Sequence, residues 1–351
     1  GNKQVSKASI KQSKLYTPQK EAKNYSPNIS GNTGTVYQHD GRNGFSSEAI
    51  DNSKNGYGMI AAGTKPLFVD SDGQMLAIYR QWCGDLCSSG QLGGTYFGDY
   101  DDFTDNDQIT NINSTGTMWG CDDVSAAYGG CGVARYPSAL GDADYPFAFW
   151  NEYTQNEDAG SFGGRPYYSL DNFGWDGGSW SYPSDVDIVY TVAKDLWVGS
   201  PAISYDNGQV KMNVAYSDWT RNDIYLFHSE AYEDGFLIMS EEKVVIDENN
   251  DLVGGDDEGS YTSQPVLEIN EDGVGYVAVT AYFSGAADIP PTSQYSNSHT
   301  LIFKATEDHG NTWSGSNTAT GNNDYYFVPD DVYDDMFADG LFPTYYQDED
   351  G

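Results

Sequence analysis

The sequence lacks long apolar runs and has little positive charge, and each of these absences excludes a class of protein. No apolar stretch approaches the roughly 18 residues that a membrane-spanning helix needs, so no membrane span is expected. Lys and Arg total 17 against 53 Asp and Glu, which gives a net charge of −36. Because so acidic a protein repels phosphate groups, nucleic-acid binding is not expected.

Long stretches of Leu, Ala, Glu and Lys, which are typical of helices, are also missing. Aromatic residues instead make up 15% of the chain, and there are 40 glycines. Aromatic side chains suit half-buried strands and glycine suits tight turns, so the composition predicts an all-β protein. The chain begins with Gly1 and shows no apolar signal segment. We therefore expect a secreted protein, extracellular or at the cell surface, that was processed at its N-terminus.

One pattern repeats along the chain at a long and nearly constant interval. In each copy a proline opens an apolar stretch, an acidic turn follows, and an aromatic-ended strand completes the hairpin. Four copies begin at Pro66, Pro137, Pro201 and Pro265, which are 71, 64 and 64 residues apart, and a fifth begins at Pro343. This period predicts a β-propeller of four-stranded antiparallel blades. Five blades are detectable, and six or more are expected if the natural chain continues.

The N-terminal region differs from the rest of the chain in charge. The first 23 residues contain six lysines and one glutamate, a balance of +5, so the remainder carries −41. We interpret residues 1–33 as a flexible basic arm or linker and residues 34–351 as the propeller. A docking helix is the alternative for the arm, because its lysines follow near-helical spacing. Its charge favours attachment to an acidic surface.

Four cysteines form two local pairs, Cys83 with Cys87 and Cys121 with Cys131. In an exported protein this spacing indicates two short disulfide loops in the insert between the first and second repeats. A zinc site is the alternative interpretation. It is disfavoured because neither pair has CxxC spacing and the four histidines are distant in sequence.

A short motif, Thr-Glu-Asp-His-Gly-Asn-Thr-Trp, lies near the C-terminus and resembles the Asp box of sialidase-like β-propellers, the bacterial neuraminidase repeats. All five specified positions are present, as Thr306, Asp308, Gly310, Thr312 and Trp313. In such a box the Asp carboxylate accepts backbone N–H groups of a turn, Gly supplies the turn conformation and Trp packs against the blade. The resemblance implies a propeller fold and a structural role for the box.

The same resemblance raises the question of catalysis, because sialidases hold the substrate carboxylate with an arginine cluster. The candidates for such a clamp are Arg135, Arg165 and Arg221. Only Arg135-Tyr136-Pro137 is similar to a family motif, Arg-Ile-Pro. No residue pattern in the sequence identifies a catalytic nucleophile or acid. The part of the chain after residue 23 has a net charge of −41, which repels an anionic sugar. We therefore expect a non-catalytic module with unknown catalytic residues, and a sialidase-like propeller glycoside hydrolase is the alternative.

An acidic loop in the third repeat suggests calcium. Asp247, Asn249, Asp251 and Glu258 place oxygen ligands at positions 1, 3, 5 and 12 of a calcium-loop pattern. Position 6 is Leu252, where an EF-hand requires glycine, so an EF-hand is not expected. The hypothesis is a loop-bound calcium ion, and the alternative is solvated surface charge. No other cofactor is expected.

An aromatic-rich segment supplies candidate binding residues, which are Tyr167, Tyr168, Trp175, Trp180 and Tyr182. Rings among small polar residues suit stacking on sugars or anchoring of a protein surface. The alternative is that the rings fill the wedge between blades. The sequence as a whole predicts a binding or surface-assembly module of a larger extracellular bacterial protein, with a protein or glycan partner at the cell surface.

Overall fold

The structure is a computed structural model, which describes most of the predicted repeats. The described residues are 36–38, 46–48, 50–51, 63–81, 91–99, 102–110, 112–113, 134–155, 162–188, 194–220, 223–240, 243–246, 264–282, 299–314, 326–328 and 330–341. No helix among them is both long and apolar enough to cross a membrane.

The described residues form an almost wholly β structure of successive antiparallel sheets, in which strands that follow one another in the chain pair, apart from one short strand added to the third sheet. The first sheet contains β3 (Leu67–Val69), β4 (Met75–Gln81), β5 (Gln91–Asp99) and β6 (Asp102–Ile109). The second contains β7 (Ala134–Gly141), β8 (Pro146–Gln155), β9 (Phe162–Leu170) and β10 (Ser184–Asp185).

The third and fourth sheets follow the same plan. The third contains β11 (Leu196–Asp206), β12 (Gln209–Asp218), β13 (Ile224–Glu233) and β14 (Phe236–Met239), and β15 (Lys243–Ile246) also pairs with β13. The fourth contains β16 (Val266–Ile269), β17 (Gly275–Tyr282), β18 (His299–Thr306) and β19 (Tyr326–Phe327). Outside these sheets lie the hairpin β1–β2 (Val36–Gln38, Ser46–Glu48) and α2 (Asp330–Ala338).

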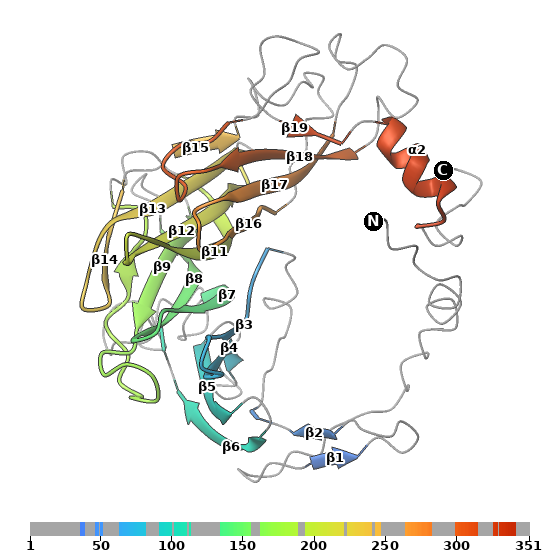
Figure 1. The fold of residues 1–351 in the computed structure, drawn as a ribbon. Helices are drawn as coiled ribbons and strands as arrows, with labels where there is room; N and C mark the ends of the chain where they lie inside the picture. Colours follow the sequence, from blue (N-terminus) through green and yellow to red (C-terminus); the bar gives the residue numbers. More distant parts are fainter. Residues whose placement is uncertain are drawn as a thin grey trace.

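The four sheets succeed one another along an arc, with β3, β7, β11 and β16 on its inner side (Figure 1). Strand β7 contacts β3 and β11, and β11 contacts β16. Each repeated proline therefore lies at or just before the innermost strand of a sheet. This arrangement of antiparallel sheets around a centre is a β-propeller, as the sequence predicted. The fifth copy, from Pro343, lies outside the described residues.

The cores lie between adjacent blades, because strand side chains alternate between two faces and neighbouring blades bury the faces that they turn toward each other. One cluster joins the first two blades, with Leu76 and Ile78 facing Ala148 and Trp150. Two further clusters join the second blade to the third and the third to the fourth. Each fully buried large apolar side chain contributes about 1.5 to 3 kcal/mol to folding.

The turns of the inner hairpins are closed by acidic or amide side chains. The Asp70 carboxylate accepts the N–H groups of Asp72 (2.9 Å) and Gln74 (2.7 Å), and Asp142 accepts those of Asp144 (2.8 Å) and Tyr145 (2.5 Å). Such side chains replace missing backbone partners in a tight turn. The Asp and Asn residues of the repeat are thus turn formers.

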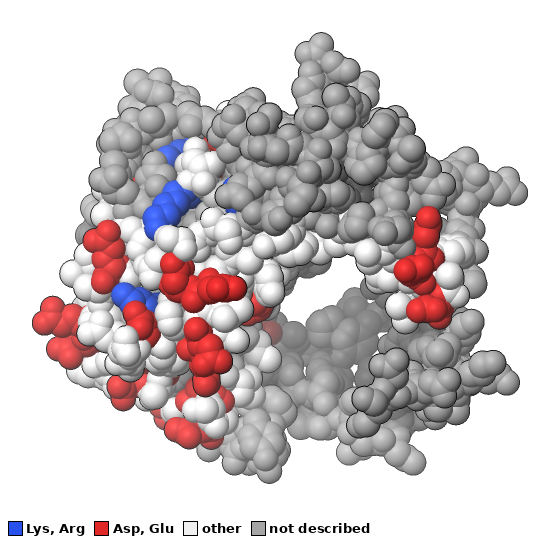
Figure 2. Space-filling view, turned by 45° about the horizontal axis from the view of Figure 1, so that its top comes forward, with Lys and Arg blue, Asp and Glu red and all other residues white. Residues whose placement is uncertain are grey.

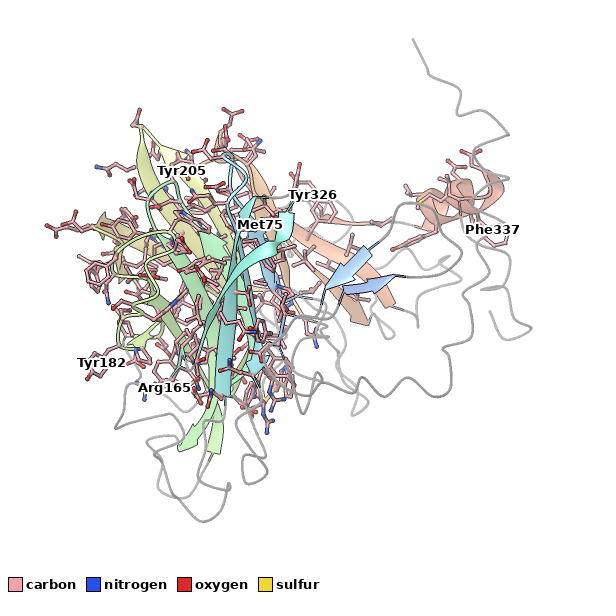
Figure 3. All side chains as sticks on the ribbon, turned by 90° about the horizontal axis from the view of Figure 1, so that it is seen from below. Met75, Arg165, Tyr182, Tyr205, Tyr326 and Phe337 are labelled. Carbon is pink, nitrogen blue, oxygen red and sulfur yellow. The ribbon has the colours of Figure 1, made fainter. Side chains whose placement is uncertain are left out.

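The propeller has two ends, which we name by its inner strands. The turn face carries the inner hairpin turns, and the start face is the opposite end, where β7 and β11 begin. Figure 3 shows Tyr205 at one end of the sheets and Arg165 at the other. In Figure 2, Asp and Glu cover more of the described surface than Lys and Arg, as the net charge requires.

Candidate functional site

Several residues singled out from the sequence lie outside the described part of the chain. They are the two cysteine pairs (Cys83, Cys87, Cys121, Cys131), the calcium-loop residues (Asp247, Asn249, Asp251, Glu258) and Arg221. Disulfides and calcium therefore stay predictions. Among the described residues, no group of three or more His, Cys, Asp or Glu side chains is placed to hold a metal ion.

The two described candidate arginines lie in the second blade and have different neighbours. Arg165 in β9 forms an ion pair with Asp185 at 2.8 Å and lies over the ring of Tyr167 at 5.6 Å. Arg135 in β7 instead lies over the ring of Trp197, in the third blade, at 5.7 Å. Arg165 is thus engaged by an acid of its own blade, whereas Arg135 faces the neighbouring blade.

The predicted aromatic segment is divided between core and surface. Tyr167 and Tyr168 are buried, and Trp175 and Trp180 pack against the core of the first two blades. Trp175 stacks on Phe68 with ring centroids 6.2 Å apart and donates its Nε1–H to the Asp142 carbonyl at 2.9 Å. Only Tyr182 of these five, at 70% exposure, presents its ring mainly to solvent. Four of the five rings therefore fill space within and between blades.

The predicted Asp box forms a hydrogen-bonded turn at the end of β18. Asp308 accepts the Thr312 N–H (2.8 Å) and hydroxyl (2.6 Å), and also the Thr306 hydroxyl (2.9 Å). Burial raises the pKa of this carboxyl, but these hydrogen bonds outweigh burial and lower it overall. His309, within the box, contacts the third blade through Ser204 and Asn213. The box therefore fixes a turn and joins two blades.

A cluster of three aromatic rings lies at the start face, between the second and third blades. The ring of Tyr136 lies 5.8 Å from that of Trp197 and 6.0 Å from that of Trp219, and the two tryptophans are 5.5 Å apart. Tyr136 and Trp197 are buried, but Trp219 is 48% exposed. The cluster thus presents the Trp219 indole to solvent, while the guanidinium of Arg135 covers the buried ring of Trp197.

Two β-bulges aim these residues toward the start face. The pairing of β7 with β8 slips between Arg135 and Ser138, and that of β11 with β12 slips between Trp197 and Ser200. In each bulge a residue other than glycine has a left-handed backbone, Tyr136 with φ 52° and Val198 with φ 58°. That conformation is costly for a β-branched residue such as Val198. Backbone strain of this kind concentrates at functional sites.

Hydrogen bonds accepted by Asp195 hold the cluster in place. Its carboxylate accepts the Nε1–H of Trp197 at 2.6 Å and the backbone N–H of Gly164 at 2.7 Å, and its carbonyl accepts the N–H of Trp219 at 2.9 Å. Gly164 packs directly on the Trp197 ring, where a Cβ would collide with it. One aspartate therefore positions both tryptophans.

Two carboxylates also lie at this end of the propeller. Asp51 accepts the Tyr79 hydroxyl (3.0 Å) and the Gln81 amide (2.8 Å), where β4 ends. Asp218 is buried at the end of β12 and accepts the Thr220 N–H at 2.9 Å. Burial chiefly raises the pKa of the Tyr79 hydroxyl, and nearby Asp51 raises it further. Tyr79 therefore stays protonated and donates.

The centre of the propeller is crossed by Lys65. Its Nζ donates to the carbonyls of Pro201 (2.8 Å) and Leu267 (2.7 Å) and pairs with Glu268 at 2.8 Å. Burial lowers the pKa of this lysine, and Glu268 opposes that shift. The residues before the four repeated prolines are Lys65, Tyr136, Ser200 and Gln264, none of which is acidic. The innermost strands thus supply no carboxylate at that position.

Comparison with known proteins gives a likeness of fold. No protein-family model matches the chain, and no curated protein sequence matches it. Among solved structures, an endo-arabinase from Bacteroides thetaiotaomicron superposes with a TM-score of 0.42 at 10% identity, covering 76% of this chain and 80% of that one. An exo-1,5-α-L-arabinanase from a bovine ruminal metagenomic library gives 0.43 at 13% identity, covering 75% and 78%. The Bacillus subtilis arabinanase Arb43A gives 0.40 at 12%, covering 75% and 79%.

Proposed function

We propose that the protein is a carbohydrate-binding β-propeller and that the start face is its binding surface. The observation that supports this is the cluster of Tyr136, Trp197 and Trp219, in which the outer ring of Trp219 is half exposed and the inner ring of Trp197 lies under Arg135. An indole ring held rigidly by hydrogen bonds suits stacking on a sugar face, because little side-chain freedom is lost on binding. Neighbouring Asp, Tyr and Gln side chains would accept and donate hydrogen bonds to hydroxyl groups.

The setting that we propose is extracellular. A net charge of −36 keeps the protein soluble and repels other anionic surfaces, while a lysine-rich arm would attach to an acidic partner. The module would then present its glycan site at the cell surface, as part of a larger secreted bacterial protein.

Glycoside hydrolysis is the second candidate function. Asp51, held by Tyr79 and Gln81, and buried Asp218 place carboxyl groups at the same end of the propeller. Hydrolysis needs two carboxyl groups about 5 to 10 Å apart. Asp51 accepts hydrogen bonds from Tyr79 and Gln81, and Asp218 accepts the Thr220 N–H, so both carboxylates already have structural roles and we favour binding over hydrolysis.

Substitution of the exposed indole tests the proposed site. Trp219→Ala should weaken binding to a neutral oligosaccharide found by array screening about tenfold or more, if a sugar ring stacks on the indole as strongly as nucleic-acid bases stack on aromatic side chains, which is worth roughly 1 to 3 kcal/mol. Titration calorimetry measures this. Tyr182→Ala is the matched control, an exposed ring on the segment predicted from the sequence. A loss with Tyr182→Ala and none with Trp219→Ala would move the site to that segment.

The same oligosaccharide distinguishes binding from hydrolysis. A binding module leaves it intact over long incubation, as followed by chromatography of the sugar. Cleavage that disappears in Asp51→Asn, with folding preserved, would establish the hydrolase instead.

A further inference from the structure

Arg80, in β4, is a buried cation at the edge of the core between the first two blades. It lies two residues beyond Ile78 and four beyond Leu76, so strand alternation directs it toward the second blade. Only 5% of the residue is exposed. Its Nε has no hydrogen-bond partner, and no ion pair is formed with it among the residues that the structure describes.

Lys194, the other buried cation among the described residues, has an acidic partner. Lys194 Nζ pairs with Asp187 at 2.9 Å, with both side chains almost fully buried. A buried charge without a partner destabilises the folded state. The chain contains 53 acidic residues that could provide such a partner. The missing partner at Arg80 therefore points to a group that comes from outside the chain.

A second cation lies beside the first. Burial lowers the pKa of Arg80, and the positive charge of Arg135 lowers it further, which places the two guanidinium groups within electrostatic reach. Arg135 begins β7, and β7 contacts β4. Because Arg135 also covers Trp197, the pair of arginines borders the aromatic cluster.

We infer that Arg80, together with Arg135, binds an oxyanion, a carboxylate or sulfate group, carried by the glycan that stacks on Trp219. The inference rests on the proposed function and narrows its ligand to acidic glycans. Guanidinium groups suit this role because they bind such oxygens through paired hydrogen bonds. The net negative charge of the protein repels an anionic ligand at long range, but salt screens that repulsion beyond about 8 Å. The two nearby arginines therefore dominate the electrostatic interaction with a bound anion.

Ligand pairs that differ only in charge test the inference. A homogalacturonan oligosaccharide and its methyl ester compare carboxylate with neutral ester, and a sulfated galactan oligosaccharide and its desulfated form test sulfate. In at least one of these two pairs, we expect the intact protein to bind the charged oligosaccharide about tenfold or more tightly than the neutral one. A tenfold difference in affinity corresponds to the strength of a charge-assisted hydrogen bond. Arg80→Met should abolish that preference, and Arg80→Lys should restore part of it. Arg165→Met, whose arginine is already paired with Asp185, should retain it.

Equal binding of charged and neutral members by the intact protein would overturn the inference, as would an equal loss of preference in Arg165→Met. Neither result affects the Trp219→Ala test, so failure of the anion site is distinguishable from failure of the glycan site.

A thermal measurement tests the anion site without any glycan. Sodium sulfate should raise the melting temperature of the intact protein above that in sodium chloride at equal ionic strength, because an anion that binds only the folded state stabilises it. The extra rise should vanish in Arg80→Met. In salt without sulfate, Arg80→Met should melt higher than the intact protein, because an uncompensated buried charge is removed. A lower melting temperature together with an unchanged sulfate effect would show that Arg80 is structural.

Discussion

The two ends of the propeller differ in how far their polar groups are satisfied. At the turn face, Asp70, Asp142 and Asp308 each accept two or more hydrogen bonds from their own turns. At the start face, Arg80 is buried without an ion pair among the described residues, and Trp219 is half exposed. One end is closed by local contacts, and the other keeps groups that a ligand would complete.

The difference extends to the backbone. The left-handed residues of the turn face are mostly glycines, for which this conformation is inexpensive, together with Asn207 and His309. A β-branched residue adopts the same conformation only at the start face, at Val198, where it is most strained among the described residues. Natural proteins trade stability for function at their binding sites. The comparison therefore assigns stability to the turn face and recognition to the start face.

The largest effect that would separate the two faces is expected for Trp175, near the turn face. Trp175→Ala removes the ring between Phe68 and Tyr96 and the donor to Asp142, so it should lower the free energy of unfolding by about 3 kcal/mol. Urea denaturation measures this. Tyr182→Ala, an exposed ring of the same segment, should change stability by less than about 0.5 kcal/mol. A stable Trp175→Ala that fails to bind glycan would instead place recognition on this segment.

The sequence predicted the elements of this comparison that depend on local pattern. The repeated prolines located the innermost strands, and the five Asp-box residues located a turn whose hydrogen bonds are those expected from the motif. Both signals lie within one blade and need no knowledge of the neighbouring blade.

Features formed between blades were not predicted. Tyr136 lies in β7, Trp197 in β11 and Trp219 directly after β12, and bulges aim the first two toward the third, so no spacing in the sequence indicates the cluster. Composition found the aromatic segment near Trp175 but did not show which rings face solvent. Arg80 did leave a signal, because Leu76, Ile78 and Arg80 alternate on one face of a strand and place a charge at a core position.

A smaller effect is expected at the centre, where Lys65 tests how sharply the two roles are separated. Lys65→Met leaves the carbonyls of Pro201 and Leu267 without their charged donor, so unfolding free energy should fall by about 2 kcal/mol. Glu268→Gln is the matched control. The Glu268 side chain is 73% exposed, and an exposed ion pair contributes less than about 1 kcal/mol. If Lys65→Met were as stable as the intact protein and lost glycan binding, the centre would belong to the recognition surface.

The smallest expected effect concerns pH at the Asp box of the turn face. Hydrogen bonds from Thr312 and Thr306 outweigh burial and hold the pKa of Asp308 below its ordinary value, so the folded state favours the ionised carboxylate. This stabilisation is complete above the ordinary Asp pKa, near 3.9, and is lost as pH falls through the lower folded value. Asp308→Asn should therefore lower unfolding free energy at pH 7 by about 1 kcal/mol, since Asp308 is partly exposed and solvent weakens its interactions.

The same variant should lose part of the decline in stability that acid causes below pH 4, as measured by urea denaturation across a pH series. Glu307→Gln is the control, because Glu307 is an exposed neighbour in the same turn. Glycan affinity at pH 7 should be unchanged in Asp308→Asn, since the box lies at the end of the sheets away from Trp219. A loss of affinity without a loss of stability would break the division of roles between the two faces, because it would mean that the turn face also contacts the ligand.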